Sequence, residues 1–223
     1  MRHDALSIPF WSPAEIAAAV RPALAQLEAR RVLAYPTETV YGFGGAIDRD
    51  SVDALVELKH RPPGKPFLLL VAGAEMIERL DLYLPSYAAN LAARHWPGPL
   101  TLVLPGGEGR VPPRLRGPEG GIAVRWTSHQ GISRLIRAHG DAITSTSANR
   151  PGVPPATSVG EILSQWGGAI ARGRLRVLDG GRLISSPPST VVDCTGRRPR
   201  VIRPGAISAS ILRESVPNLI GDA

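Results

Sequence analysis

The chain of 223 residues contains a single cysteine, only two lysines and few aromatic residues. Cys194 has no companion for a disulfide or a zinc site, so we expect a small, buried strand residue there. An aromatic content of 5% offers few stacking platforms for single-stranded nucleic acid. No run approaches the ~18 to 20 apolar residues of a membrane span, and residues 1–30 lack a secretion signal. The sequence therefore predicts a cytoplasmic protein with no membrane contact.

Positive charge is supplied almost entirely by arginine. The net charge is +7 and the isoelectric point is near 10.4, which suggests an anionic partner such as a nucleotide, RNA or a membrane surface. The basic residues are scattered and form no tail. A basic surface produced by a general bias toward arginine remains an equal alternative.

Helical and strand patterns alternate along the chain. Ser12, Pro13 and Glu15 have the spacing of a capping residue, a first-turn proline and a capping-box glutamate, and predict a helix from 13 to about 30. Further helices are expected at 51–61, 74–81, 86–95, 130–138, after a capping box of Ser158 and Glu161, and close to the chain end. Strands are expected at 31–37, 67–72, 100–105, 121–126, 142–147 and 174–181, with a hairpin in 189–205. This order predicts an α/β fold with a mixed sheet.

The segment richest in proline and glycine is "LPGGEGRVPPRLRGPEGG", at 104–121. It could mark a domain boundary. The apolar strands on either side have the character of members of one sheet, so we expect a long surface loop near a functional site.

Four polar or basic segments adjoin the predicted strands, at 36–45, 59–66, 144–152 and 202–205. Open α/β sheets bind their ligands in loops of this kind. The glycines of "GFGG" lack the spacing of a dinucleotide fingerprint, and no phosphate-binding P-loop pattern is present. Any phosphate must therefore be bound in another way.

Both lysines, Lys59 and Lys65, lie in one short segment with Arg61 between them. The helix dipole favours cations at a helix end, but arginine would serve that purpose equally well. Keeping lysine only here suggests a site that distinguishes a compact ammonium from a planar guanidinium, with chance clustering as the competing explanation.

Small polar residues and two isolated arginines complete the candidate site. "TSTSAN" is either an ordinary strand-to-turn junction or a set of anchors for phosphate oxygens, a metal-bound water or an amino-acid carboxylate. Arg125 ends a buried strand, where a charge is costly unless it is paired or faces a pocket, and Arg203 has the same character. The histidines lack metal-ligand spacing, and no catalytic triad is indicated. The predicted chemistry is positioning and charge neutralisation at an anionic substrate.

The motifs "YPTETVYGFGG", K-x-R-P-x-x-K-P, "WPGPLTLVLP", "IAVRW", "TSTSANRPG", "STVVD" and "VIRPGAI", in this order, resemble the YrdC/TsaC family of threonylcarbamoyl-AMP synthases. The resemblance covers about residues 13–212 and implies one YrdC-like domain over 1–223, with a twisted mixed sheet, flanking helices and a concave basic cavity. It also implies an enzyme that joins L-threonine, bicarbonate and ATP into threonylcarbamoyl-adenylate and pyrophosphate. That product supplies a tRNA modification, threonylcarbamoyladenosine, through separate transfer proteins.

The same resemblance implies roles for individual residues. Those around the reacting groups would be Lys59, Arg61, Ser147 and Asn149. Those in contact with ATP would be Arg61, Lys65, Asn149, Thr157 and Arg203. Those in contact with L-threonine would be Thr37, Arg125, Ser147 and Ser189, with Arg125 at the carboxylate. Mg²⁺ is expected with ATP, without a dedicated metal site in the protein, and a weak contact with tRNA is compatible with the basic cavity.

The chain departs from many family members at Leu70, where they have a histidine that contacts threonine. It resembles the single-domain type, without the C-terminal domain of longer members. Two alternatives stay open: an RNA-binding module without catalysis, and a relative that forms carbamoyl-adenylate from carbamoyl phosphate.

Overall fold

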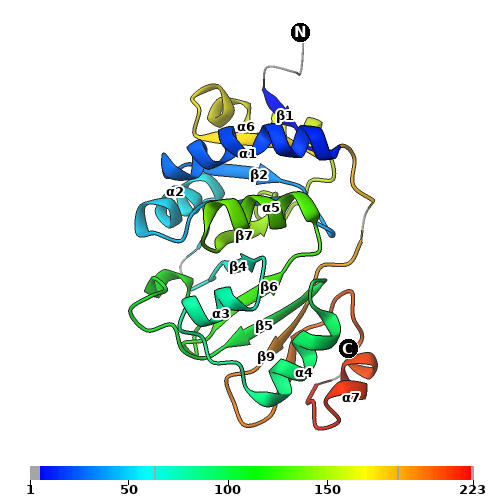
Figure 1. Cartoon of the computed structure of the whole chain (residues 1–223). Coiled ribbons are helices and arrows are strands. Elements are labelled where there is room, and N and C mark those ends of the chain that lie inside the picture. The colour runs from blue at the N-terminus through cyan, green and yellow to red at the C-terminus, as the bar shows by residue number, and fades with distance from the viewer. Residues whose placement is uncertain (1–5, 63, 185, 222–223) are drawn as a thin grey trace.

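The computed structural model describes residues 6–62, 64–184 and 186–221 (Figure 1). Its helices are α1 (Pro13–Glu28), α2 (Arg49–Lys59), α3 (Glu75–Arg79), α4 (Ser86–His95), α5 (Gln130–His139), α6 (Val159–Ala171) and α7 (Ala209–Ser215), with a 3₁₀ turn at Pro113–Leu115. Its strands are β1 (Ser7–Pro9), β2 (Val32–Tyr35), β3 (Gly42–Gly44), β4 (Leu68–Val71), β5 (Leu100–Leu104), β6 (Ile122–Trp126), β7 (Ile143–Ser147), β8 (Leu175–Asp179), β9 (Thr190–Asp193) and β10 (Arg200–Arg203).

The ten strands of the described chain form one mixed sheet in the order β1-β8-β2-β3-β7-β4-β6-β5-β9-β10. Parallel pairs such as β4 with β6 and β5 with β9 alternate with antiparallel pairs such as β7 with β4 and β9 with β10. The predicted α/β class, the mixed sheet and the hairpin at the end of the chain are therefore confirmed. Segments far apart in the sequence meet at the sheet centre, where β3 and β4 flank β7.

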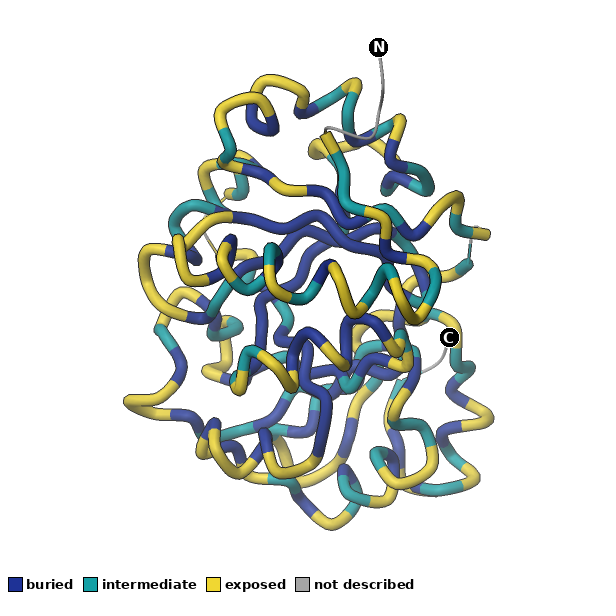
Figure 2. Tube along the Cα trace, turned by 45° about the horizontal axis from the view of Figure 1, so that its top comes forward, coloured by how far each residue is buried: buried dark blue, intermediate teal, exposed yellow. Residues whose placement is uncertain are grey.

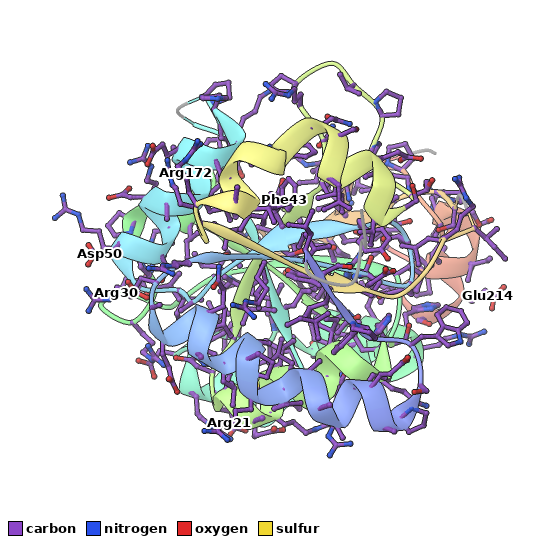
Figure 3. The ribbon with its side chains drawn as sticks, turned by 90° about the horizontal axis from the view of Figure 1, so that it is seen from above. Arg21, Arg30, Phe43, Asp50, Arg172 and Glu214 are labelled. Atoms are coloured by element: carbon purple, nitrogen blue, oxygen red, sulfur yellow. The ribbon has the colours of Figure 1, made fainter. Side chains whose placement is uncertain are left out.

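Helices cover both faces of the sheet. Helices α1 and α5 lie together on one face, and α6 lies on the opposite face, as the view from above shows (Figure 3). On the α6 side, the ring of Phe43 in β3 meets the ring of Trp166 edge to face, with centroids 4.7 Å apart. Packing of helices on both faces explains why β2 and β4 are continuous apolar runs, whereas the central β7 is largely polar.

The core follows the central strands, which are almost wholly buried (Figure 2). Leu33, Leu69 and Leu102, on β2, β4 and β5, have no exposed surface. Truncating a leucine at such a position to alanine lowers the free energy of unfolding by about 2 to 5 kcal/mol in close-packed cores. The strands that bear the polar residues of the predicted site are thus held rigidly.

Helix boundaries follow the capping chemistry. The capping box of α1 is confirmed: the Glu15 amide donates to Ser12 Oγ (3.3 Å) and the Ser12 amide donates to Glu15 Oε2 (2.8 Å). Helix α2 starts at Arg49 rather than 51, because the Asp48 carboxylate caps it by accepting from the Ser51 amide (3.1 Å).

The capping box expected at Ser158 and Glu161 is wrong, although α6 does begin directly after Ser158. The Ser158 side chain forms no capping hydrogen bond. The Glu161 carboxylate instead accepts from the amide of Thr157, one residue earlier, at 2.8 Å. The glutamate therefore steadies the loop before the helix.

The glycine-rich stretch after Tyr41 is a strand, not the loop that its composition predicts. Gly42–Gly44 forms β3, which pairs antiparallel with β2 and with β7. A Cβ atom on Gly44 would lie 1.8 Å from the Thr144 carbonyl oxygen, so close approach of two backbones requires glycine there. The short β1 was also not predicted; it extends the sheet beyond β8.

Three remaining predictions concern the loop, the cysteine and membranes. The 104–121 segment joins β5 and β6, which are antiparallel neighbours, so it is a loop within one sheet as expected. Cys194 is buried as predicted, directly after the end of β9, and burial raises the pKa of its thiol to about 12. Within the described residues, no helix has both the length and the apolar character needed to cross a membrane.

Candidate functional site

A cavity of about 840 Å³ lies against the middle of the sheet, within the size range of small-molecule sites. Strands β4 to β7, the β2–β3 loop, the β9–β10 hairpin and the loops before β9 and α6 contribute to its wall. The predicted site residues that line it are Thr37, Arg61, Arg125, Ser147, Thr157, Ser189 and Arg203. Lys59, Lys65 and Asn149 are not among its lining residues. The fold thus brings seven of the ten predicted residues to one cavity and sets three behind it or beside it.

Lys59, the last residue of α2, supports the β7 end from behind the cavity. The residue is 7% exposed, and Nζ donates to the carbonyls of Ser147 (2.7 Å) and Asn149 (2.6 Å) and to Asn149 Oδ1 (2.7 Å). An ammonium has three donors, and all three are used. Burial, followed by repulsion from Arg61, lowers the pKa of Lys59 to about 8. Three convergent acceptors suit a compact ammonium better than a planar guanidinium, which gives a structural reason for lysine here.

The Ser147–Asn149 turn is tied to this ammonium. The Ser147 hydroxyl donates to Asn149 Oδ1 (2.7 Å), and Asn149 Nδ2 donates to the Val153 carbonyl (2.7 Å). Asn149 Oδ1 therefore joins Lys59 and Ser147 in one network. Of this network, Ser147 is the member that faces the cavity.

Arg61 lines the same side of the cavity and is held by backbone carbonyls. Nε donates to the Lys65 carbonyl (2.8 Å), Nη2 to the Pro66 carbonyl (2.6 Å) and Nη1 to Thr146 Oγ1 (3.1 Å). Its guanidinium also lies over the Phe67 ring, 4.5 Å from the centroid. Burial lowers the pKa of Arg61. Lys65, by contrast, is exposed.

Thr37 shapes the β2–β3 loop at another edge of the cavity. Its Oγ1 donates to the Val40 carbonyl (2.7 Å) and accepts from the amides of Thr39 and Val40 (both 3.2 Å). This is a hydroxyl-stabilised turn, which keeps Thr37 and Thr39 at the cavity wall.

Arg125 carries a buried charge with incomplete pairing. The residue is 4% exposed on β6, and its Nε lies 3.7 Å from Oε1 of Glu38. Neither of these two buried atoms has a hydrogen-bond partner. Within the described chain, its terminal nitrogens Nη1 and Nη2 donate no hydrogen bond. Arg125 can therefore bind an anion from the cavity with two parallel donors.

Arg203, on β10, lies near Arg125 and has no acidic partner in the described residues. Its Nη2 donates to the carbonyl (2.8 Å) and the hydroxyl (3.1 Å) of Ser189. Burial and then the charge of Arg125 lower the pKa of Arg203. The Ser189 hydroxyl also contacts Thr101 Oγ1 at 2.8 Å, because β5 and β9 run side by side. Two neighbouring guanidiniums that share a single carboxylate, that of Glu38, favour binding of an anion.

Thr157 lies before α6, where Glu161 holds it. The Glu161 carboxylate accepts from the Thr157 amide (2.8 Å) and hydroxyl (3.3 Å). The Thr157 carbonyl in turn accepts from the Leu183 amide (2.8 Å). Thr157 is thus a fixed point between α6 and the segment that leads to β9, which runs along the side of the molecule (Figure 1).

Several cavity residues were not predicted from the sequence. Thr101, Asp193 and Arg200 line the cavity because distant strands are adjacent in the sheet. Thr101 and Asp193 stand inside the quoted motifs "WPGPLTLVLP" and "STVVD", whereas Arg200 lies outside all of them. Glu38 stands inside the quoted motif "PTETVYG", so a signal for it existed but was not used. The 104–121 loop does adjoin the site as expected, since Glu119 lines the cavity and pairs with Arg200 at 3.8 Å.

Leu70 is fully buried on β4 and pairs with Arg125 across the β4–β6 ladder. An apolar residue therefore lies beside the guanidinium at the position where many family members have histidine. Among the described residues there is no group of three or more histidine, cysteine, aspartate or glutamate side chains that could hold a metal ion.

Comparison with known proteins places the chain in a family. The family model of Sua5/YciO/YrdC proteins, described as telomere recombination, matches residues 25–205. A threonylcarbamoyl-AMP synthase of Pyrococcus abyssi is 36% identical over 204 residues, which are 91% of this chain and 57% of that protein. A protein of the same name from Chromohalobacter salexigens is 36% identical over 180 residues, covering 80% of this chain and 94% of the relative.

Solved structures show the same fold. Sua5 of P. abyssi in complex with L-threonine superposes with a TM-score of 0.82 at 33% identity, over 90% of this chain and 58% of that one. YciO of Escherichia coli gives a TM-score of 0.76 at 25% identity, over 87% and 93% of the two chains. This chain thus spans less than two thirds of the P. abyssi proteins and most of the shorter relatives. The chain belongs to the Sua5/YciO/YrdC family.

Proposed function

We propose that this protein is a threonylcarbamoyl-AMP synthase, which forms threonylcarbamoyl-adenylate and pyrophosphate from L-threonine, bicarbonate and ATP. The observation that carries the proposal is the buried Arg125, whose terminal nitrogens donate to no described residue, next to the exposed Arg203 in a cavity also lined by Arg61. An amino-acid carboxylate and a polyphosphate are anions of the kind that this arrangement attracts. The family membership and the L-threonine complex of P. abyssi Sua5 support the same assignment.

L-Threonine is assigned to the part of the cavity around Arg125. The free terminal nitrogens of Arg125 match a carboxylate, and the hydroxyls of Thr37, Ser147 and Ser189 line the same cavity. Each hydroxyl can both donate and accept, so the group can serve the ammonium and the hydroxyl of the amino acid.

ATP is assigned to the parts around Arg61, Thr157 and Arg203, all of which line the cavity. Lys65 is exposed and beside this region, where a flexible ammonium can meet phosphate oxygens from outside. Asn149 acts through Ser147, to which it is hydrogen bonded at 2.7 Å.

The proposed reaction has two parts. The threonine amine and bicarbonate give N-carboxy-threonine and water; the new carboxylate oxygen then attacks the α-phosphorus, and pyrophosphate leaves with the electrons of the broken P–O bond. Both partners of the second step are anions, so catalysis depends on alignment and on offsetting their repulsion. Arg61 and Arg203 supply fixed positive charge, and Lys59 holds Ser147 in place.

Mg²⁺ is proposed to accompany ATP, and the residues present fit that role only through the nucleotide. The nearest cavity carboxylates, Asp193 and Glu119, both pair with Arg200. Mg²⁺ characteristically keeps several waters and binds substrate phosphates together with few protein ligands. When bound, it would neutralise phosphate charge, held by the phosphate oxygens and water rather than by a carboxylate of the wall.

We also propose a cytoplasmic enzyme that passes its product to separate transfer proteins acting on tRNA. The acyl-phosphate bond of the product is labile, which favours direct transfer to the next protein. A net charge of +7 is compatible with a weak, salt-sensitive contact with tRNA.

The test is pyrophosphate release by the purified protein with ATP and Mg²⁺, with L-threonine and bicarbonate omitted in turn. The proposal expects release only when both are present. Release that ignores threonine but requires carbamoyl phosphate would assign carbamoyl-adenylate chemistry instead. Folded protein that binds ATP but releases no pyrophosphate in any mixture would contradict the proposal and favour a binding role.

A further inference from the structure

The carboxylate of Glu38 contacts the guanidinium of Arg125, with Oε1 3.7 Å from Nε. The Glu38 side chain is 15% exposed and that of Arg125 is 5% exposed. Glu38 does not line the cavity, whereas Thr37 and Thr39 on either side of it do. The Glu38 side chain is therefore in place to act on Arg125 rather than on a ligand.

A second contact fixes the glutamate. Its Oε2 accepts a hydrogen bond from Thr127 Oγ1 at 2.7 Å, and Thr127 is 1% exposed. The same hydroxyl accepts from the His129 amide (3.1 Å), while the Thr127 carbonyl accepts from Ser133 Oγ (3.1 Å). Thr127 thus links the start of α5 to the Glu38 carboxylate.

The second carboxylate oxygen of Glu38 and the Nε of Arg125 are placed to form a hydrogen bond when a ligand occupies the site. Glu38 Oε1 and Arg125 Nε are both buried and without hydrogen-bond partners, 3.7 Å apart. Buried charges of this kind are costly unless they are paired with good geometry. A small rotation of the guanidinium would convert the contact into a hydrogen bond and leave Nη1 and Nη2, which donate to no described residue, for a ligand.

We propose that Glu38, itself held by Thr127, is a positioning residue that orients Arg125 for bidentate capture of the amino-acid carboxylate. Through Nε, Glu38 restricts the guanidinium plane; through its charge, it offsets the repulsion between Arg125 and Arg203. This inference rests on the proposed function, because it takes threonine as the ligand of Arg125. It adds a residue of the chain that touches neither substrate.

The sign of the effect separates positioning from simple electrostatics. A negative charge near a carboxylate site repels the ligand, so removing it by Glu38→Gln would tighten threonine binding if charge alone mattered. If orientation of Arg125 matters more, the same substitution weakens binding. The two readings therefore predict changes in opposite directions.

The experiment measures L-threonine binding by calorimetry and KM and kcat in the pyrophosphate assay for wild type, Glu38→Gln and Thr127→Val. We expect threonine affinity to fall by about 10- to 100-fold in Glu38→Gln and by roughly 3- to 10-fold in Thr127→Val. The KM for ATP should stay within a factor of about 2, a split that a general loss of structure would not produce. Glu57→Gln, a surface charge change paired with Arg174, is the matched control and should behave as wild type.

Threoninamide, which lacks the carboxylate, provides the second arm. It should bind wild type and Glu38→Gln with similar affinity, because the lost interaction concerns only the carboxylate. Unchanged or tighter threonine binding in folded Glu38→Gln would overturn the inference. Wild-type protein that neither binds threonine nor requires it for pyrophosphate release would instead contradict the proposed function itself, so the two failures are distinguishable.

Discussion

The cavity has basic residues on two sides, and the two sides differ in how many of the hydrogen-bond donors of these residues are bound by the protein itself. On the β7 side, Lys59 and Arg61 give most of their donors to carbonyls of the protein. On the β6 and β10 side, Arg125 and Arg203 lie near one another. The only carboxylate described next to them is that of Glu38, which contacts Arg125 without forming a hydrogen bond. A cation whose donors are bound to protein carbonyls fixes the backbone around it, whereas a cation with unused donors can bind an anion. In the proposed function, Lys59 supports the first wall, Arg61 of that wall also contributes charge for ATP, and the second wall binds the threonine carboxylate.

Arg125→Ala should give the largest effect, since it removes the least satisfied cation of the binding wall. We expect threonine-dependent turnover to fall by about 100- to 1000-fold, as a charge-assisted bidentate contact is lost. Pyrophosphate release with threonine titrated over a wide range measures it. Arg125→Lys serves as the partner variant and should recover little, because an ammonium lacks the planar fork. A normal KM for threonine in Arg125→Ala would contradict the proposal that Arg125 binds the threonine carboxylate.

Lys59 tests the supporting wall by geometry rather than by charge. Lys59→Arg keeps the charge but cannot place three donors at the acceptors on Ser147 and Asn149, so it should lose nearly as much turnover as Lys59→Met, about 10- to 100-fold. Hydrogen exchange of residues 147–153 should quicken in both variants. Normal turnover in Lys59→Arg, with loss in Lys59→Met, would show that only the charge is needed.

Lys65 differs from the buried Lys59, because its side chain is exposed to solvent. Lys65→Ala should raise the KM for ATP by about 3- to 10-fold and leave the melting temperature unchanged, since exposed charge contacts are weak. Lys65→Arg should be close to wild type. If Lys65→Arg raised the KM for ATP as much as Lys65→Ala, ATP binding would require the ammonium group itself and not only a positive charge.

The smallest expected effect is a pH dependence of stability. The pKa of Lys59 is lowered from 10.5 to about 8, mainly by burial. Between these values the unfolded state binds more protons than the folded state, so the free energy of unfolding gains a contribution that rises with pH. Denaturant unfolding of wild type relative to Lys59→Met should show a gain of about 1 to 2 kcal/mol from pH 8 to 10.5. A flat difference across that window would contradict the lowered pKa.

The sequence predicted most long elements because their patterns are local. The Ser12 and Glu15 capping box and the apolar strands are examples. It failed at β3, where three buried residues carry too little pattern and Gly44 is required by contact with Thr144, which lies far along the chain. Pattern reasoning cannot see such long-range close packing.

The site could be predicted where a single residue is unusual for its place in the sequence. Arg125 stood out because a charge ended a buried strand, and the structure places it in the cavity. Glu38 and Thr101 stand inside quoted motifs, but their roles could not be predicted, because their partners next to β6 and β9 are brought near only by the sheet. The hydrogen bonds of Lys59 to Ser147 and Asn149 could not be read from the sequence either, because they join the end of α2 to the end of β7.

The solitary thiol offers an experimental handle. Cys194 is buried, and burial raises the pKa of its thiol to about 12, so maleimide reagents should leave the native protein almost unmodified. Ile184, by contrast, is 91% exposed, between the Leu183 amide bonded to Thr157 and the Ser186 hydroxyl bonded to Thr39. A fluorophore on Ile184→Cys would thus report from a segment fastened to two edges of the cavity, with no background label to subtract.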